Sequence, residues 1–258
     1  MSDLKTNGAL AVSPWISCPK PNPNADLRLF CFPYAGGSAV IYQRWPEILP
    51  ATIELCAVQL PGRGTRHAEQ PFTRVEPLVE AAAENLLPFM DRPFALFGHS
   101  VGAIIGFELA RYLRREHGLE PLRLLVSGRR APQVPDTEPP TYDLPEAEFM
   151  EKLRQLNGTP KEVMEHAELM QMMIPLLRAD FAVSETYAYY EESPLSCPIS
   201  AYGGLQDFEV PRENLEAWRE QTNAAFLLRM LPGDHFFLNR SQPQLVWALA
   251  RELAGDIA

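Results

Sequence analysis

The stretch FALFGHSVGA, residues 94–103, places Ser100 between a short apolar run and a segment of helical periodicity. Its first four residues indicate a buried strand, and the apolar spacing from Val101 onward predicts a helix with one charged face. Gly-x-Ser-x-Gly between a strand and a helix is typical of a sharp turn that presents a serine nucleophile. Gly98 and Gly102 suit such a turn, because side chains there would clash with neighbouring backbone. A serine that caps the helix is the alternative, and the strand and helix context favours the nucleophile.

Short apolar runs alternate with helical segments along most of the chain. Because these runs are apolar throughout, they suit a sheet that is buried on both faces. Strands that alternate with helices predict an α/β fold with a mostly parallel, doubly wound sheet, and 258 residues fit one such domain. The strand candidates are residues 27–32, 54–60, 94–97, 122–127, 198–202 and 226–231, and the helix candidates are 75–89, 101–116, 212–221 and 242–253.

Two segments depart from this alternation. Residues 1–26 are rich in proline, asparagine and polar residues, so we expect a loose arm there, with ordered structure and a single domain over residues 27–258. Between about 135 and 192, helical stretches follow a proline-rich loop without an intervening strand, which predicts a helical lid over the strand ends. Five of the eight methionines lie in this insertion, and their flexible side chains suit varied apolar ligands. We name three of them as candidates for the lid or a ligand chamber, with packing onto the body as the alternative: Met164, Met170 and Met173.

Composition argues against several classes of protein. The chain has 33 acidic and 23 basic residues and a formal net charge of −10, which disfavours a nucleic-acid partner. No apolar run is long enough to cross a membrane, and the amino terminus lacks the basic start and apolar core of a signal peptide, so we expect a cytoplasmic protein without a membrane partner. The four cysteines lack zinc-site spacing, and we expect no metal.

A serine nucleophile needs a base that takes its proton, and His235 has the expected position. It follows the last strand candidate and a Pro-Gly-Asp turn and precedes the last helix, which is where the base of this fold class lies. The other histidines lie beside Ser100, at the end of a helix, in the insertion and in an early loop: His99, His117, His166 and His67.

The base in turn needs a carboxylate that orients its ring. Asp207 follows the strand candidate 198–202 on a strand-end loop, between the nucleophile and the base in chain order. Asp234 is a competitor, but as the neighbour of His235 it would struggle to reach the same ring, and Glu209 is a weaker rival. An Asx turn or a helix cap is the alternative role for Asp207.

A glycine-rich loop, residues 33–38, follows the first strand candidate. A loop there can bring a backbone N–H group toward an acyl oxygen. We predict the N–H groups of Ala35 and Val101 as the oxyanion hole. The glycine pair alone is equally consistent with an ordinary turn.

With these elements placed, the chain resembles the α/β-hydrolase superfamily and, within it, the type II thioesterases of polyketide and non-ribosomal peptide synthesis. The resemblance covers residue 27 to the carboxyl terminus and rests on Asp207 and four motifs: FPYAGGSA (32–39), QLPGRGTR (59–66), FGHSVGA (97–103) and GDHFFL (233–238). It implies an α/β-hydrolase fold, a triad of Ser100, Asp207 and His235, and a mobile lid formed by the helical insertion.

The resemblance also implies an activity, which is hydrolysis of acyl groups from the phosphopantetheine thiol of acyl or peptidyl carrier proteins. Through an acyl-serine, such an enzyme removes aberrant or stalled chains, and small acyl thioesters are further substrates. No cofactor of its own is expected, since the substrate carries the phosphopantetheine, and we expect a monomer. Four arginines are candidates for docking or phosphate contacts, with solvated loop charges as the alternative: Arg63, Arg66, Arg129 and Arg130.

Three other functions stay open at this stage. The same triad would serve a chain-terminating fatty acyl thioesterase or a small-molecule carboxylesterase. A non-catalytic acyl-carrier binding protein belongs to another class. Turnover separates them, because an editing enzyme prefers thioesters to matched oxygen esters, and a binder holds the acyl-carrier without releasing acid.

Overall fold

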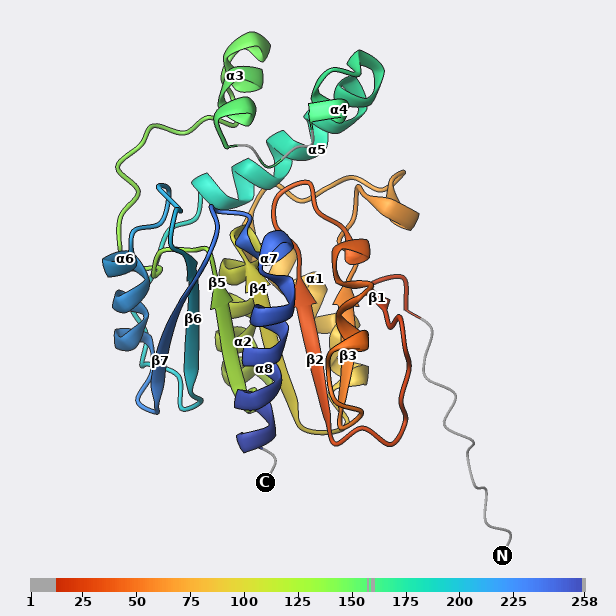
Figure 1. The fold of residues 1–258 in the computed structure, drawn as a ribbon, viewed down its shortest axis with the longest axis vertical. Coiled ribbons are helices and arrows are strands. Elements are labelled where there is room, and N and C mark those ends of the chain that lie inside the picture. The colour runs from red at the N-terminus through yellow and green to blue at the C-terminus, as the bar shows by residue number, and fades with distance from the viewer. Residues whose placement is uncertain (1–12, 157, 159–160, 257–258) are drawn as a thin grey trace, which may run out of the picture.

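The computed structural model describes residues 13–156, 158 and 161–256 of the chain. Within these residues, seven strands form one sheet in the order β1-β3-β2-β4-β5-β6-β7 (Figure 1). The strands β2 to β7 run parallel, as the sequence predicted, and β1 is antiparallel to β3. The bounds are β1 Ile16–Ser17, β2 Leu27–Phe32, β3 Ile53–Val58, β4 Phe94–His99, β5 Arg123–Ser127, β6 Ile199–Gly204 and β7 Phe226–Leu231.

Helices cover both faces of this sheet. One face packs against α1 and α2, and the opposite face packs against α8 (Figure 1). Among the residues described, none of the helices combines the length and the apolar character that a membrane crossing requires. The helices are α1 Val75–Leu86, α2 Val101–His117, α3 Glu146–Leu156, α4 Lys161–Met164, α5 Ala167–Glu185, α6 Arg212–Glu216, α7 Phe237–Arg240 and α8 Gln242–Asp256.

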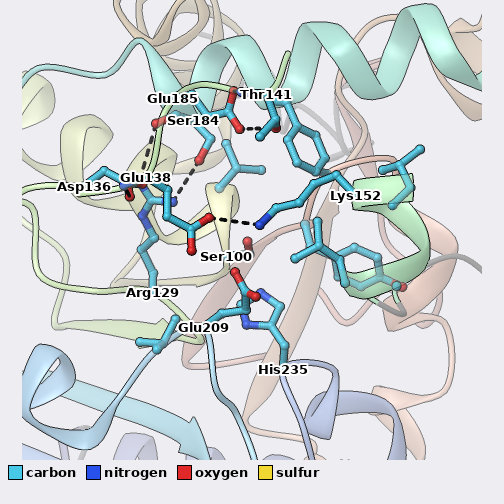
Figure 2. Close-up of a pocket in the computed structure, with 18 of the residues that line it drawn as sticks. Ser100, Arg129, Asp136, Glu138, Thr141, Lys152, Ser184, Glu185, Glu209 and His235 are labelled. Carbon is cyan, nitrogen blue, oxygen red and sulfur yellow. Dashed lines mark hydrogen bonds and ion pairs between the residues drawn. The ribbon is translucent and has the colours of Figure 1, made fainter. Parts of the chain in front are cut away.

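The helices α3, α4 and α5 follow β5 in the chain and precede β6. They stand over one end of the sheet (Figure 1) and share a small apolar cluster of their own around Phe149 and Met170. Side chains of α3 and α5 form one side of the cavity drawn in Figure 2, and Ser100 lies on the other side. The predicted helical insertion is therefore present, whereas its movement as a lid stays a prediction.

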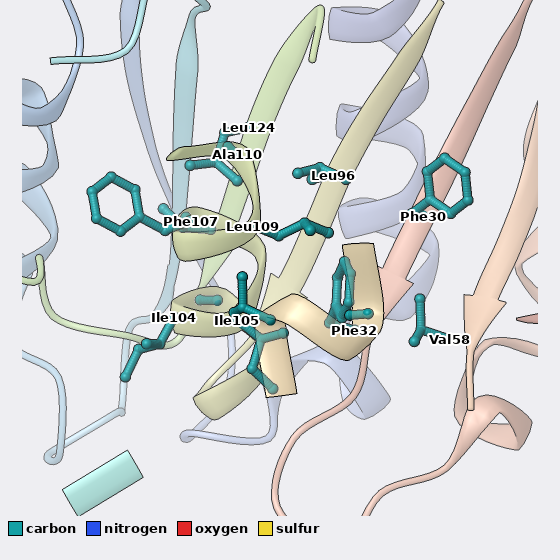
Figure 3. Packing of buried hydrophobic residues seen from close by; sticks show 14 of the residues in the cluster. Phe30, Phe32, Val58, Leu96, Ile104, Ile105, Phe107, Leu109, Ala110 and Leu124 are labelled. Carbon is teal, nitrogen blue, oxygen red and sulfur yellow. The ribbon is translucent and has the colours of Figure 1, made fainter. Parts of the chain in front are cut away.

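The helix α2 is held against the sheet by its apolar stripe. Figure 3 shows Ile105 and Leu109 among the strand side chains, which include Phe32 and Leu96. At its carboxyl end, Gly118 takes a left-handed conformation with φ of 63° and donates its N–H to the Arg114 carbonyl. This packing holds the first residue of α2, and with it the turn that carries Ser100, at the end of β4.

The sequence predicted ordered structure only from Leu27, and this was wrong for residues 13–26. Ile16 and Ser17 pair with β3, and Trp15 is buried beneath the Arg66 guanidinium, whose carbon lies 4.3 Å from the ring centroid. A two-residue strand is too short to show a periodic pattern, and the tryptophan was its only signal. Residues 1–12 of the predicted arm lie outside the described residues.

Candidate active site

Ser100 occupies the turn between β4 and α2 in a strained conformation. Its φ is 54° and its ψ is −120°, and it is the only non-glycine residue with a positive φ among those described. Such a conformation costs on the order of 1–3 kcal/mol and persists where the surroundings impose it. A Cβ at Gly98 would lie 2.0 Å from the Gly102 carbonyl oxygen, and one at Gly102 would lie 2.4 Å from the Phe32 carbonyl oxygen. The Ser100 side chain makes no capping hydrogen bond to α2, so the alternative role of a helix cap does not apply.

The structure brings His235 and Asp207 together from two different strand-end loops. The His235 Nδ1 lies 2.9 Å from Asp207 Oδ2, and the Asp207 carboxylate is fully buried. Its other oxygen, Oδ1, accepts hydrogen bonds from the N–H groups of Glu209 at 2.9 Å and Val210 at 3.2 Å. Because an ionised carboxylate only accepts, this contact places the proton of the ring on Nδ1 and leaves Nε2 free to act as a base. The Asx turn is thus present as well, and it holds the carboxylate in place.

The competing carboxylates take other positions. Asp234 Oδ1 accepts a hydrogen bond from the Phe236 N–H at 3.0 Å, as expected for a neighbour that does not reach round to the ring. Glu209 is exposed and lines the cavity, and none of its described contacts is with His235.

Ser100 and His235 both line a cavity of about 260 Å³ (Figure 2). The His235 side chain is 15% exposed, and its ring lies beside that of His99, with 5.3 Å between the centroids. Burial lowers the pKa of His99 well below its usual range, so this second histidine stays neutral at physiological pH. His99 Nδ1 contacts Ser127 Oγ at 2.9 Å, which ties the ring to β5. The fixed ring of His99 therefore packs against the ring of His235 and helps to hold it in place.

The predicted oxyanion donors, Ala35 and Val101, line the same cavity beside Ser100. The loop after β2 uses its neighbouring N–H groups elsewhere: Gly37 donates to the Tyr34 carbonyl at 2.8 Å, and Gly36 donates to Asp180 Oδ2 at 2.7 Å. Within the described part of the chain, the N–H groups of Ala35 and Val101 have no hydrogen-bond partner. Two unused N–H donors in the cavity that Ser100 lines are consistent with an oxyanion hole, and this assignment stays a prediction.

Asp180, on α5, is a residue that the sequence did not single out. Its carboxylate forms a bidentate pair with the Arg63 guanidinium, at 2.8 and 2.7 Å, and both side chains are about 5% exposed. Arg63 also donates to the Gly37 carbonyl at 3.2 Å. The pair thus joins the helical insertion to the loop that carries Ala35. Because the Arg63 side chain is buried and paired, neither its predicted docking or phosphate contact nor the alternative of a solvated loop charge was right.

The three predicted methionines lie in the insertion, but none of them lines the cavity that holds Ser100. Met164 and Met170 line a separate cavity of about 220 Å³ between α3, α4 and α5, and Met173 packs against the same cluster. Helical spacing identified apolar positions without showing which of them face the sheet. The apolar residues of α3 and α5 that do line the Ser100 cavity are Leu153, Leu156, Leu177 and Phe181.

The polar side of the cavity carries several charges. Arg129 extends from the loop after β5 and Lys152 from α3 (Figure 2), and Arg130, the residue after Arg129, also lines the cavity.

Among the residues the structure describes, no three His, Cys, Asp or Glu side chains gather as a metal site would require. The absence of a metal and of a cofactor remains an expectation.

A parallel sheet with a serine at a strained strand-to-helix turn, and a histidine–aspartate pair on later strand-end loops, defines the α/β-hydrolase fold. The family model described as the thioesterase domain matches residues 27–253. The chain belongs to this thioesterase family.

Similar proteins agree with this assignment. The chain is 49% identical over 240 residues to the protein named linear gramicidin dehydrogenase LgrE of Brevibacillus parabrevis, with 91% of each chain covered. It is 46% identical over 242 residues to the gramicidin S biosynthesis protein GrsT of Aneurinibacillus migulanus, with 94% of each covered. Among solved structures, the type II thioesterase BorB from the borrelidin biosynthetic cluster has a TM-score of 0.84 and 36% identity, covering 95% of this chain and 98% of its own. The resemblance to type II thioesterases is confirmed.

Proposed function

We propose that this chain is a serine thioesterase that removes aberrant or stalled acyl groups from the phosphopantetheine thiol of acyl or peptidyl carrier proteins. The observation that carries the proposal is the contact of His235 with buried Asp207 at a cavity that Ser100 also lines. Membership of the thioesterase family and the likeness to BorB support the substrate class. The proposal includes a cytoplasmic monomer that needs no cofactor of its own.

Each candidate residue has a role in the proposed reaction. Ser100 Oγ attacks the thioester carbonyl while His235 Nε2 takes its proton, and Asp207 stabilises the imidazolium that forms. The N–H groups of Ala35 and Val101 donate to the carbonyl oxygen as it becomes negative, and the amino end of α2 adds a favourable dipole. The thiol leaves with the proton from His235. A water molecule then repeats the sequence on the acyl-serine and releases the acid.

One relative carries the name of a dehydrogenase, and the sequence offers no support for that activity here. The glycine pattern G-x-G-x-x-G, which binds a dinucleotide after a strand, does not occur in the 258 residues. The loop after β2 instead carries the unused N–H group of Ala35.

Turnover of matched substrates tests the proposal. The full chain is given an acyl-loaded carrier protein, the same acyl group on N-acetylcysteamine, and its p-nitrophenyl ester. An editing thioesterase releases acid fastest from the carrier and hydrolyses the small thioester in preference to the oxygen ester. A carboxylesterase shows the opposite order, and a binding protein retains the acyl-carrier without releasing acid. Either of these two results contradicts the proposal.

A further inference from the structure

The loop that carries Arg129 is joined to the Ser100 turn by a backbone hydrogen bond. The Ser100 N–H donates to the carbonyl of Ser127, the last residue of β5, at 2.8 Å. Gly128 follows with a φ of 57°, and a Cβ there would lie 2.7 Å from the His99 ring. The next carbonyl, that of Arg129, accepts a hydrogen bond at 2.8 Å from the buried Trp218 indole. The backbone of Arg129 is therefore fixed beside the nucleophile turn, and its side chain lines the cavity (Figure 2).

The Arg129 guanidinium has no carboxylate partner within 4 Å in the described part of the chain. Its Nη1 donates to Ser184 Oγ at 2.8 Å, and its Nη2 donates to the Ser184 carbonyl at 3.4 Å. Ser184 lies in the last turn of α5, where the helix dipole supplies only a partial negative charge. A guanidinium has five N–H donors, so three remain for a ligand.

Apart from the exposed Glu209, the other Arg, Lys, Asp and Glu side chains of this cavity already have partners. Two cations pair with two carboxylates, and a third carboxylate, Glu185, accepts three hydrogen bonds from the chain at 141–142. The contacts are Arg130 with Asp136 at 2.8 Å, Lys152 with Glu138 at 2.9 Å, and Glu185 with Thr141 N, Thr141 Oγ1 and Tyr142 N at 2.7, 2.6 and 2.9 Å. Desolvation opposes the charge of Lys152, but the hydrogen bond to Glu138 and the negative charges of the exposed Glu209, Glu138 and Glu185 raise its pKa overall. None of these carboxylates pairs with Arg129.

Partial burial of the Arg129 guanidinium without a carboxylate partner is unfavourable. Desolvation, followed by repulsion from Arg130, lowers the pKa of Arg129 to about 10, so the group still carries its charge at neutral pH. A buried charge costs free energy unless it is paired, and an acceptor oxygen of a ligand would offset that cost. Apolar side chains of the insertion, Leu153, Leu177 and Phe181, line the same cavity. A ligand that matches both kinds of lining group has an alkyl part and an acceptor oxygen.

We propose that Arg129 forms a subsite for acyl groups that carry an oxygen acceptor, a carbonyl or a carboxylate, on the chain beyond the thioester. The enzyme then prefers such oxygenated acyl thioesters to plain alkyl thioesters of the same length. This inference rests on the proposed thioesterase function and specifies its substrate class. Arg129 acts here on specificity, and the bond-breaking steps remain those of Ser100 and His235.

The test uses three six-carbon acyl groups on N-acetylcysteamine: hexanoyl, 5-oxohexanoyl and adipoyl. We expect the wild-type kcat/KM for at least one oxygenated substrate to exceed that for hexanoyl by about 10-fold or more, the scale of a hydrogen bond to a charged group. Arg129→Met brings this ratio to about one. The matched control is Arg130→Met, because that cation is already paired with Asp136, and it keeps the ratio. The adipoyl and 5-oxohexanoyl arms show whether the charge or the acceptor is recognised.

Two results overturn the subsite. One is a wild-type ratio of one or below, which needs no variant, and the other is a folded Arg129→Met enzyme that keeps the wild-type preference. Thermal melting and fluorophosphonate labelling of Ser100 show whether a variant is folded. If Arg129→Met does not fold, Arg129→Lys keeps the charge and loses the planar fork, and we expect it to lower the ratio. A wild-type enzyme that hydrolyses no thioester contradicts the proposed function instead, so the two failures are distinguishable.

Discussion

The sheet and the helical insertion contribute to the same cavity but are built differently. Every residue of β2, β3, β4 and β6 is buried, whereas α3 buries only Phe149 and Leu153 of its eleven residues. The candidate triad lies entirely on the ends of the sheet, where the surrounding core holds even the strained φ of Ser100. The insertion supplies walls and charges instead. In the proposed reaction, the chemistry takes place at the ends of the buried strands, and the insertion, whose helix α3 buries few residues, supplies the surroundings of the substrate.

The largest effect is expected from a substitution at the end of the sheet, at Ser100. Ser100→Ala removes the hydroxyl of the proposed nucleophile, and we expect the packing of α2 to stay unchanged. We expect hydrolysis of an acyl thioester to fall by a factor on the order of 10⁴ to 10⁶, with the melting temperature nearly unchanged. Single-turnover assays together with thermal melts measure both. Retained turnover would show that the nucleophile is another residue.

Asp207→Asn separates the two roles of this side chain. The amide oxygen can still accept from the Glu209 N–H, so the turn and the stability should be kept, but the amide nitrogen opposite Nδ1 favours the wrong ring tautomer. We expect kcat to fall by about 10³ to 10⁴-fold. Asp234→Asn is the matched control, because that carboxylate accepts a hydrogen bond from the local Phe236 N–H and not from the His235 ring, and the kcat of this variant should change little. Similar losses in the two variants would argue against a selective role for Asp207.

The next largest effect is expected at the Arg63–Asp180 ion pair, which joins the insertion to the loop after β2. In Asp180→Asn, Arg63 loses its buried counter-ion, and the loop with Ala35 loses a charged acceptor for the Gly36 N–H. We expect a loss of stability of about 3 kcal/mol or more, and a fall in kcat of about 10 to 100-fold as the oxyanion donor moves. The measurements are urea unfolding and steady-state kinetics.

A second buried pair, Arg28 with Glu54 at 2.7 Å, is a control for this joint. It lies at the start of β2 and β3, away from the cavity, so Glu54→Gln should lower stability in the same way while kcat is kept. If Asp180→Asn also keeps kcat, the Arg63 pair is a structural contact only.

The parts of the site that sequence analysis found have local signals. The glycines around Ser100, and the order of strand, loop and helix around Asp207 and His235, follow from steric needs and from the period of apolar residues. Parallel strands bring their carboxyl ends to one edge, so chain order was enough to predict which loops meet there. The fold class and the grouping of Ser100, Asp207 and His235 followed from such local patterns.

The parts that were missed depend on pairings across long stretches of chain. Arg63 and Asp180 are 117 residues apart in sequence, and neither carries a mark of its partner. The period of a helix likewise shows that Met170 is apolar, but not that it faces α3 instead of the Ser100 cavity. Prediction from one sequence thus worked where steric rules are local and failed where tertiary packing selects one face or one partner.

The smallest expected effect concerns an ion pair within the insertion, Lys152 with Glu138. It joins α3 to the loop after β5 at 2.9 Å, but its side chains are 21% and 62% exposed, in contrast to the buried Arg63 pair. Exposed pairs contribute about 0.2–1 kcal/mol and are screened by salt. A double-mutant cycle with Lys152→Met and Glu138→Gln should therefore give a coupling energy within that range by urea unfolding, falling further between low and high salt. A coupling above about 2 kcal/mol that resists salt would mean that the insertion is held as rigidly as the sheet, and the contrast between the two regions would not stand.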